Sequence, residues 1–391
     1  MTTTMPVSAA DRVFADSVTR LLDRSCPYQR IADTEASTDG YDTALWSKLT
    51  GLGWTTFFAG ETGFDRSSLP PLALLLSELG RRGAALPLLQ TAMATVLASA
   101  PGLTATGRSL LGGIGYGEHP VAVVGADFGS RIHADLEGDG VRLASPALPA
   151  TEWLQEARTI VVPLHVRTGR RAAVLPVALP AADSRILRIT PVGTLDNERA
   201  ARAVLTEDAL IGSDCWLAAE PVGQRRWRSM LVLACLLRAA ELTGLGRGML
   251  DLVLQHVRRR EVFGRPLARF QAVQHMCADA ATRLRSATLL TAEAVELAST
   301  DRDFERTAAT AIYTTGRAVA GLALTAAQLH GGIGFTAEFP LNVYFRRAKA
   351  QQMRSGSLTD QVDEIGRWLP AAGHWWSLHP GSTAPPWAGG N

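Results

Sequence analysis

Apolar positions recur with helical spacing through the first hundred residues. A first helix begins near residue 8 and places Val18, Leu21 and Leu22 on one face. The same spacing predicts further helices over residues 42–52, 71–79 and 87–98. We expect Gly80 to end the third of these, because glycine commonly follows the last residue of a helix. The N-terminal part is therefore predicted to be helical.

The pattern changes after residue 101. Short runs rich in β-branched residues alternate with turn residues, which is typical of strands. The runs cover residues 121–124, 159–162, 172–175 and 203–205. Asp139-Gly140 suits a two-residue hairpin turn. We predict a small β-barrel or sandwich in this part of the chain.

Long helical patterns return near residue 216. Three helices of bundle length are predicted over residues 225–262, 271–298 and 304–329, with a shorter fourth over 358–369. They indicate an antiparallel four-helix bundle. The predicted fold class is therefore α+β: a helical domain (1–100), a β domain (101–215) and a helical bundle (216–369). The tail (370–391) contains three tryptophans, which either pack on a neighbouring surface or belong to a disordered segment.

Composition narrows the class of protein. The chain has 391 residues, 47% of them hydrophobic and 19% charged, which is typical of a soluble globular protein. A net charge of +2 argues against a nucleic-acid surface. The four cysteines are far apart and form no CxxC pair, so we expect neither a zinc site nor disulfides, and a cytoplasmic location. No signal peptide is expected, and the longest apolar stretch, which ends at Arg238, is too short to span a membrane.

Two motifs near helix ends suggest contact with a phosphate. Gly331-Gly332 follows a long Ala-rich helix, and either it simply breaks that helix or its bare backbone lets a pyrophosphate approach. The second motif includes Arg260, whose guanidinium could supply permanent charge to the same phosphates, although a basic helix end needs no ligand. Gln271 either simply begins a helix or recognises an adenine edge or a ribose.

The order and spacing of these motifs resemble the C-terminal domain of the acyl-CoA dehydrogenase family. The relevant segments are Arg-x-x-Phe-Gly-x-Pro-x-x-x-Phe-Gln at 260–271 and Gln-x-x-Gly-Gly-x-Gly at 328–334. The resemblance implies FAD shared between two subunits. It assigns the following residues to cofactor binding: Arg260, Phe263, Leu267, Gln271, Gln328, Gly331, Gly332 and Ser357.

The chain departs from the family where the catalytic base is expected. The family reaction is α,β-desaturation of an acyl-CoA thioester, and it needs a glutamate base. The resemblance places Ser355 at the usual base position and Ala234 at the alternative one. Cys235 stands where active members usually carry arginine. Glu241, two turns after Ala234 on the same helix face, is either a displaced base or a structural, salt-bridged glutamate.

The middle domain also lacks a convincing flavin-binding pattern, since Trp153 is followed by Leu-Gln-Glu. This combination resembles the base-lacking subunit of heteromeric acyl-CoA dehydrogenases, including those of steroid degradation. It implies an α2β2 assembly in which a base-bearing partner completes the site. Two alternatives remain: a stand-alone homo-oligomeric dehydrogenase with a relocated base, and a non-redox or flavin-free family member in a biosynthetic pathway.

Overall fold

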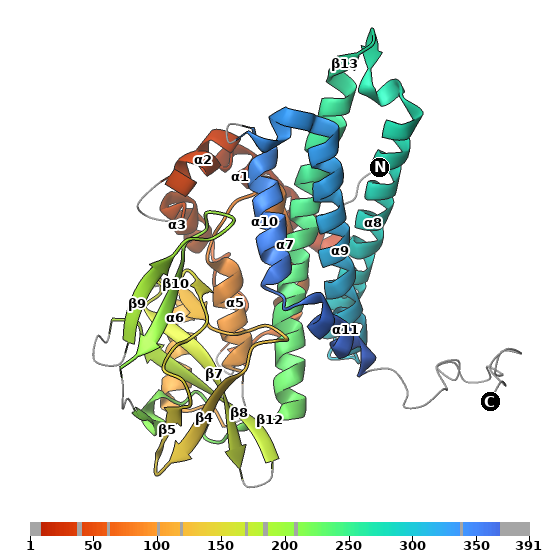
Figure 1. The fold of residues 1–391 in the computed structure, drawn as a ribbon. Coiled ribbons are helices and arrows are strands. Elements are labelled where there is room, and N and C mark those ends of the chain that lie inside the picture. The colour runs from red at the N-terminus through yellow and green to blue at the C-terminus, as the bar shows by residue number, and fades with distance from the viewer. Residues whose placement is uncertain are drawn as a thin grey trace, which may run out of the picture.

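The computed structural model describes residues 9–36, 41–60, 63–99, 102–117, 120–168, 171–182, 187–206, 210–336 and 339–367. The predicted tail from residue 370 lies outside these ranges. The chain forms a mixed α+β structure, as the sequence predicts. Helices occupy the N-terminal and C-terminal parts, and a curled sheet lies between them in the sequence (Figure 1).

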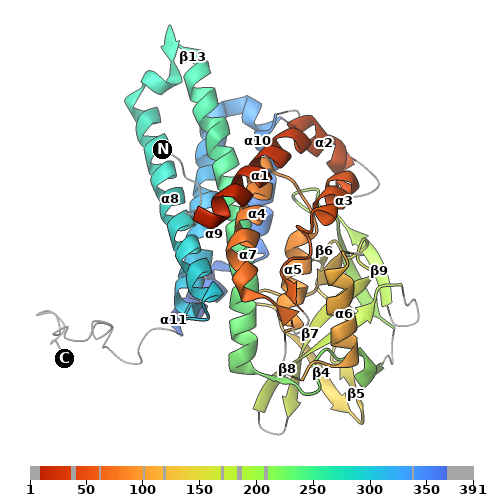
Figure 2. The same cartoon turned by 180° about the vertical axis from the view of Figure 1, so that it is seen from behind.

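The N-terminal helices lie along one side of the bundle and over the β structure (Figure 2). They are α1 (Ala9–Ser25), α2 (Tyr28–Ala36), α3 (Thr43–Gly51), α4 (Leu69–Arg82), α5 (Leu88–Leu97) and α6 (Ala105–Gly115). Asp42 caps α3 by accepting a hydrogen bond from the Leu45 amide. The predicted end of α4 at Gly80 is wrong, because the helix continues to Gly83, whose φ is 63°.

The middle part confirms the predicted strand chemistry. Its largest sheet has the order β11-β5-β4-β7-β8-β12, with β3 also paired to β7, and a second sheet has the order β6-β10-β9. The strands are β3 (Val121–Val123), β4 (Ile132–Glu137), β5 (Gly140–Leu143), β6 (Thr151–Glu152), β7 (Thr159–Thr168), β8 (Arg171–Pro180), β9 (Leu187–Val192), β10 (Ala200–Leu205), β11 (Leu210–Gly212) and β12 (Val222–Gly223). The turn between β4 and β5 is Gly138-Asp139, one residue earlier than predicted, because Gly138 supplies the positive φ of 58° at its first position.

The C-terminal part is a helical bundle. Its elements are α7 (Gln224–Arg259), the hairpin β13 (Glu261–Val262) and β14 (Arg265–Pro266), α8 (Gln271–Ser299), α9 (Glu305–His330), the short turn η4 (Gly331–Phe335), α10 (Leu341–Met353) and α11 (Leu358–Gly366). The predicted shorter helix over residues 358–369 is present as α11, whereas α10 is a further helix that was not predicted. Figure 1 shows the β13–β14 hairpin projecting from one end of the bundle, with the β structure near the other end.

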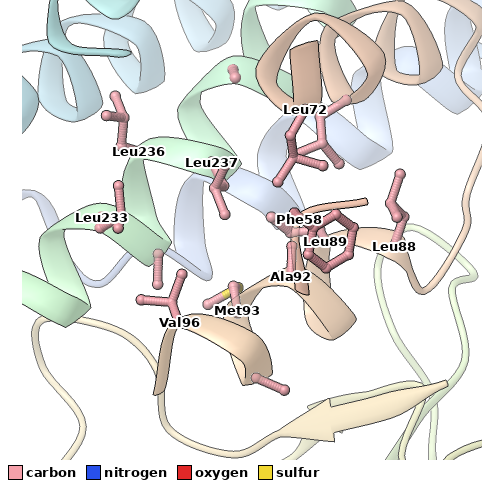
Figure 3. Close-up of a cluster of buried hydrophobic side chains, with 14 of the residues drawn as sticks. Phe58, Leu72, Leu88, Leu89, Ala92, Met93, Val96, Leu233, Leu236 and Leu237 are labelled. Carbon is pink, nitrogen blue, oxygen red and sulfur yellow. The ribbon is translucent and has the colours of Figure 1, made fainter. Parts of the chain in front are cut away.

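The central helix α7 runs the length of the bundle and packs against α4, α5, α8 and α9. Figure 3 shows part of the core where α4, α5 and α7 meet around Phe58, Leu72 and Leu237. By length and composition, α7 and the segment Glu305–Phe335 could each cross a membrane. However, 89% of the apolar window of α7 is buried inside the protein, which makes α7 a core helix.

Candidate functional site

The residues singled out from the sequence separate into two groups at different levels of α7. Ala234 lies beside the β structure, whereas Arg260 follows the last residue of the helix. A helix rises about 1.5 Å per residue, so these two positions are about 39 Å apart. That span exceeds the length of one extended dinucleotide. One FAD could therefore not reach both groups within a single chain.

The first group surrounds the β13–β14 hairpin. Phe263 and Gly264 form its two-residue turn, with φ values of 54° and 74°. Glycine adopts this left-handed conformation readily, but for phenylalanine it is strained. The Phe263 side chain is also 91% exposed. A strained, exposed aromatic residue at a projecting tip indicates a functional role, because so exposed a side chain contributes little packing within the chain to offset the backbone strain.

The flanks of the hairpin are braced by short-range contacts. The Leu267 amide donates to the Arg260 carbonyl at 2.8 Å, and the Arg265 guanidinium stacks over Phe270 at 4.2 Å. Gln271 is the first residue of α8. Arg260 and Gln271 are exposed, and Leu267 is half-buried. These contacts therefore hold the hairpin in place, and the exposed side chains of Arg260 and Gln271 face solvent.

The end of α9 lies at the same end of the bundle. The His330 ring packs against His256 of α7 with centroids 4.2 Å apart, which joins the two helix ends. Gly331 has a φ of 62°, and an added Cβ at Gly331 or Gly332 would meet no atom within 4 Å. The structure thus brings the 260–271 and 328–332 segments together and leaves the glycine backbone open. This arrangement fits the approach of a pyrophosphate.

The second group surrounds a cavity of about 260 Å³ where α5, α7, the β structure and the end of α10 meet. We call it the junction pocket. It is lined by Gln90, Met93, Val123, Gly125, Ala126, Asp127, Ala150, Thr151, Glu152, Arg238, Met353 and Arg354. Its volume lies just below the usual range of ligand pockets, about 300–1,000 Å³.

Charged side chains bridge the walls of the junction pocket. Arg238 of α7 is 3% exposed and donates to Glu152 of β6 at 3.2 Å. Arg354 pairs with Glu152 at 2.7 Å and with Asp196 at 2.6 Å. Burial alone would raise the pKa of Glu152, but Arg238 and Arg354 together hold it below its ordinary value. A carboxylate held in this way is a poor proton acceptor.

The other carboxylate of the pocket is also engaged. Asp127 accepts hydrogen bonds from the backbone amides of Gly129 and Ser130, at 2.8 and 2.7 Å. These amides are consequently occupied by the chain itself. Among the described residues that line the pocket, neither Asp127 nor Glu152 is free to act as a base.

The two base positions implied by the resemblance lie beside this pocket. Ala234 is fully buried, and the thiol of its neighbour Cys235, whose pKa burial raises to about 12, faces the Ala126 carbonyl at 3.9 Å. Ser355 is buried, and its hydroxyl donates to the Gln351 carbonyl at 3.4 Å. Neither position offers a group that takes up a proton near neutral pH.

Glu241 does not line the junction pocket but a separate space of about 10 Å³, which it shares with Glu198, Arg347 and Gln351. Burial raises its pKa to about 7, and its Oε2 atom has no hydrogen-bond partner among the described residues. That pKa would suit a base. The space holds about one water molecule, however, and therefore no thioester.

Ser357 is separated from the other predicted cofactor residues. It lies beyond the end of α10 that is opposite η4, about 20 Å away by the rise of a 13-residue helix. Its hydroxyl and amide form a capping box with Asp360 at the start of α11. The Ser-x-x-Asp pattern carried this signal in the sequence. The observed role of Ser357 is thus helix capping.

Sequence reasoning missed the ion pairs of the junction pocket. Arg238 was treated only as the end of an apolar run, and Glu152 and Arg354 were not recognised as partners. A signal was present, because a lone arginine within a long apolar helix is rarely buried unless it is paired. Nothing in the sequence identified which carboxylate, 86 positions away, would pair with it.

The sequence is similar to that of known acyl-CoA dehydrogenases. Residues 223–369 match the family model for the acyl-CoA dehydrogenase C-terminal domain. The mitochondrial short/branched chain specific acyl-CoA dehydrogenase of Rattus norvegicus is 34% identical over 34% of this chain, but this match spans only 31% of the relative. Acyl-CoA dehydrogenase IpdE2 of Mycolicibacterium smegmatis is 25% identical over 92% of this chain and 98% of its own length.

Solved structures show the same fold. A variant of the Tcur3481–Tcur3483 steroid ACAD is 26% identical, with a TM-score of 0.78, covering 91% of this chain and 96% of that one. The ChsE4–ChsE5 complex from Mycobacterium tuberculosis has a TM-score of 0.80 at 24% identity, covering 95% of this chain and 100% of that one. Residues 223–369 therefore match the acyl-CoA dehydrogenase family, and the chain as a whole has the acyl-CoA dehydrogenase fold.

Proposed function

We propose that this chain is the non-catalytic subunit of a FAD-dependent, heteromeric acyl-CoA dehydrogenase. A partner subunit carries the glutamate base and the flavin ring. This chain contributes the β13–β14 hairpin and the end of α9 to the adenosine and pyrophosphate of that FAD. The observation that carries the proposal is Phe263, a strained and exposed residue at the tip of a hairpin that is otherwise well braced.

The junction pocket supports the division of labour. A flavin ring and a thioester would have to displace Arg238 from Glu152, and Glu152 is the ion-pair partner of this buried arginine among the described residues. Breaking such a pair by removing one partner typically costs about 3–5 kcal/mol. The pocket of this chain therefore fits the cofactor poorly, whereas the hairpin end fits its pyrophosphate well.

In the assembled enzyme, bound FAD would accept the hydride removed from the acyl-CoA. The residues of this chain would bind and orient the cofactor without touching the reacting atoms. The Arg260 guanidinium supplies charge to the pyrophosphate, and Gly331 and Gly332 let the phosphate oxygens approach the backbone. Gln271 and Gln328 are exposed beside them and can hydrogen-bond the adenosine half.

The heteromeric relatives support a partner subunit. The ChsE4–ChsE5 and Tcur3481–Tcur3483 structures each contain two differently named chains, and the fold of this chain matches theirs over more than nine-tenths of its length. An α2β2 heterotetramer with acyl-CoA as the partner's substrate is the assembly we propose. The cytoplasmic location stays a prediction, based on the wide spacing of the four cysteines in the sequence.

Co-expression tests this proposal. The chain is purified alone and with candidate base-bearing subunits, and FAD is measured by its absorbance per complex. We expect the lone chain to retain no FAD and a complex to retain it. Arg260→Ala should weaken retention at least about tenfold, because it removes a charged hydrogen bond.

Arg283→Ala is the matched control, because Arg283 is an exposed arginine of α8 whose ion pair among the described residues is with exposed Asp279. It should leave FAD retention unchanged. Full FAD occupancy and thioester oxidation by the lone chain would instead identify a stand-alone dehydrogenase. A chain that takes up no FAD with any partner would identify a flavin-free family member.

A further inference from the structure

A stack of aromatic rings connects the two segments that we assign to the pyrophosphate. His256 lies in the last turn of α7, and its ring centroid is 4.2 Å from that of His330 at the end of α9, with an interplanar angle of 30°. Phe339 packs against His330, at 5.1 Å between centroids. The stack therefore spans α7, α9 and the segment before α10.

The backbone around each histidine leads directly to a cofactor residue. The His256 carbonyl accepts a hydrogen bond from the Arg260 amide at 2.8 Å. His330 precedes Gly331 in the chain, and its Nδ1 atom lies 2.8 Å from the Ala326 carbonyl. A change in the spacing of the two rings must consequently change the spacing between Arg260 and Gly331.

The surroundings of the stack favour neutral imidazoles. Nδ1 of His330 must carry a proton to donate to the Ala326 carbonyl, which leaves Nε2 as an acceptor. Nε2 is buried and has no partner among the described residues, so a second proton there would add an uncompensated buried charge. Burial lowers the pKa of both histidines, and for His256 the charges of His330 and Arg260 lower it further.

Among the described residues, no carboxylate contributes to the pKa of either histidine. Phe339 does not titrate, and η4 contributes glycines, Ile333 and Phe335. The charged group that acts on the stack is thus Arg260, whose sign opposes protonation. Acid should separate the two rings by repulsion, and with them the two helix ends.

We infer that His256 and His330 are positioning residues for the dinucleotide pyrophosphate. Only the neutral pair holds Arg260 and the Gly331-Gly332 backbone at the separation that the two phosphates require. FAD retention by the complex is then strongest at neutral pH and weakens as the pH falls below about 6.5, the ordinary histidine value. This inference rests on the proposed function.

The test measures FAD retention by the co-expressed complex between pH 5 and 8. His256→Ala removes one ring of the stack and should weaken retention about tenfold at every pH. His256→Phe keeps an aromatic ring but cannot titrate, so it should match the wild type at pH 8 and lose less FAD at pH 5. The phenylalanine variant also serves if the alanine variant fails to fold.

His133→Phe is the matched control, because His133 belongs to the other histidine pair of the described chain, on β4 and β7. It should reproduce the wild-type pH profile. FAD retention that is identical in the wild type and both His256 variants would overturn the positioning role while leaving the proposed function intact. A wild-type complex that holds no FAD at neutral pH would refute the proposed function, and this inference with it.

Discussion

Phe263 is the residue at which local structure and function conflict most clearly. A non-glycine residue in the left-handed region destabilises the fold by about 1–2 kcal/mol. Because the Phe263 side chain is exposed, packing within the chain does not offset this cost. The family motif identified this position from the sequence. Neither its φ nor its exposure could be predicted, because both follow from how the hairpin projects beyond the bundle.

Replacing Phe263 with asparagine should separate stability from assembly. Asparagine tolerates a positive φ, so we expect Phe263→Asn to stabilise the lone chain by about 1 kcal/mol in chemical denaturation. The same change should weaken the complex with the base-bearing partner, measured by size-exclusion chromatography. Tyr116→Asn is the control, because Tyr116 is also exposed but has an ordinary φ of −85°. An unaffected complex would show that Phe263 makes no contact with a partner.

The residues of the junction pocket show what a sequence motif cannot predict, because a motif assigns single positions and not contacts between distant segments. The sequence identified Ala234 and Ser355 as lacking a base, because the resemblance names single positions. It did not reveal the ion pairs of Arg238 and Arg354, which depend on residues from β6 and from the segment before β10. Pairing between distant segments becomes visible only in three dimensions.

At the scale of elements, a glycine within a helical pattern can either end the helix or allow close contact with a neighbouring helix. We predicted that Gly80 ends α4, which is wrong. Gly80 lies inside the helix, where an added Cβ would be 2.2 Å from the Glu241 carbonyl of α7. Gly244 faces α4 from the other side, with an added Cβ 1.7 Å from the Ser77 carbonyl. The glycines therefore permit close contact of α4 and α7 instead of ending a helix.

Substitution at this contact should be strongly destabilising. Gly244→Ala places a methyl group against the Ser77 backbone carbonyl. Either helix would have to shift to relieve this clash, and the shift would cost contacts along the length of the helix. We expect a loss of about 3 kcal/mol in thermal or chemical unfolding. Gly112→Ala in α6 is the control, since its Cβ would meet nothing within 4 Å, and it should stabilise by about 0.5–1 kcal/mol. Equal effects of the two substitutions would contradict close helix packing as the cause.

The long helices α7, α8 and α9 were predictable because their apolar spacing is sustained. Helix α10 was missed because Arg346, Arg347 and Lys349 obscure its apolar face. Arg347 is buried nevertheless, since Glu35 of α2 accepts from it at 3.1 Å. The sequence thus suffices for the fold class, but not for an element whose buried face is charged and paired.

At the scale of the whole molecule, one network of buried charges joins the three parts of the chain. Glu35 of α2 pairs with Arg346 and Arg347 of α10, Arg354 pairs with Asp196 and Glu198 of the β part, and Arg238 of α7 pairs with Glu152 of β6. Glu241 lies beside this network and adds a fifth carboxyl group to four guanidinium groups. One carboxyl group is therefore in excess, and burial favours its neutral form.

This excess predicts a stability that falls as the pH rises. Burial raises the pKa of Glu241 to about 7 from its ordinary value of 4.5, and burial beside Asp196 raises that of Glu198. A raised carboxyl pKa contributes stability that is complete below pH 4.5 and is lost as the pH rises through the folded-state value. The thermal midpoint of the wild type should decline between about pH 4.5 and 7, whereas Glu241→Gln should show a smaller decline because it cannot ionise. Glu137→Gln, at an exposed residue paired with Arg142, should keep the wild-type slope. If Glu241→Gln kept that slope as well, the excess proton would have to lie on Glu198, and Glu198→Gln would then flatten the profile instead.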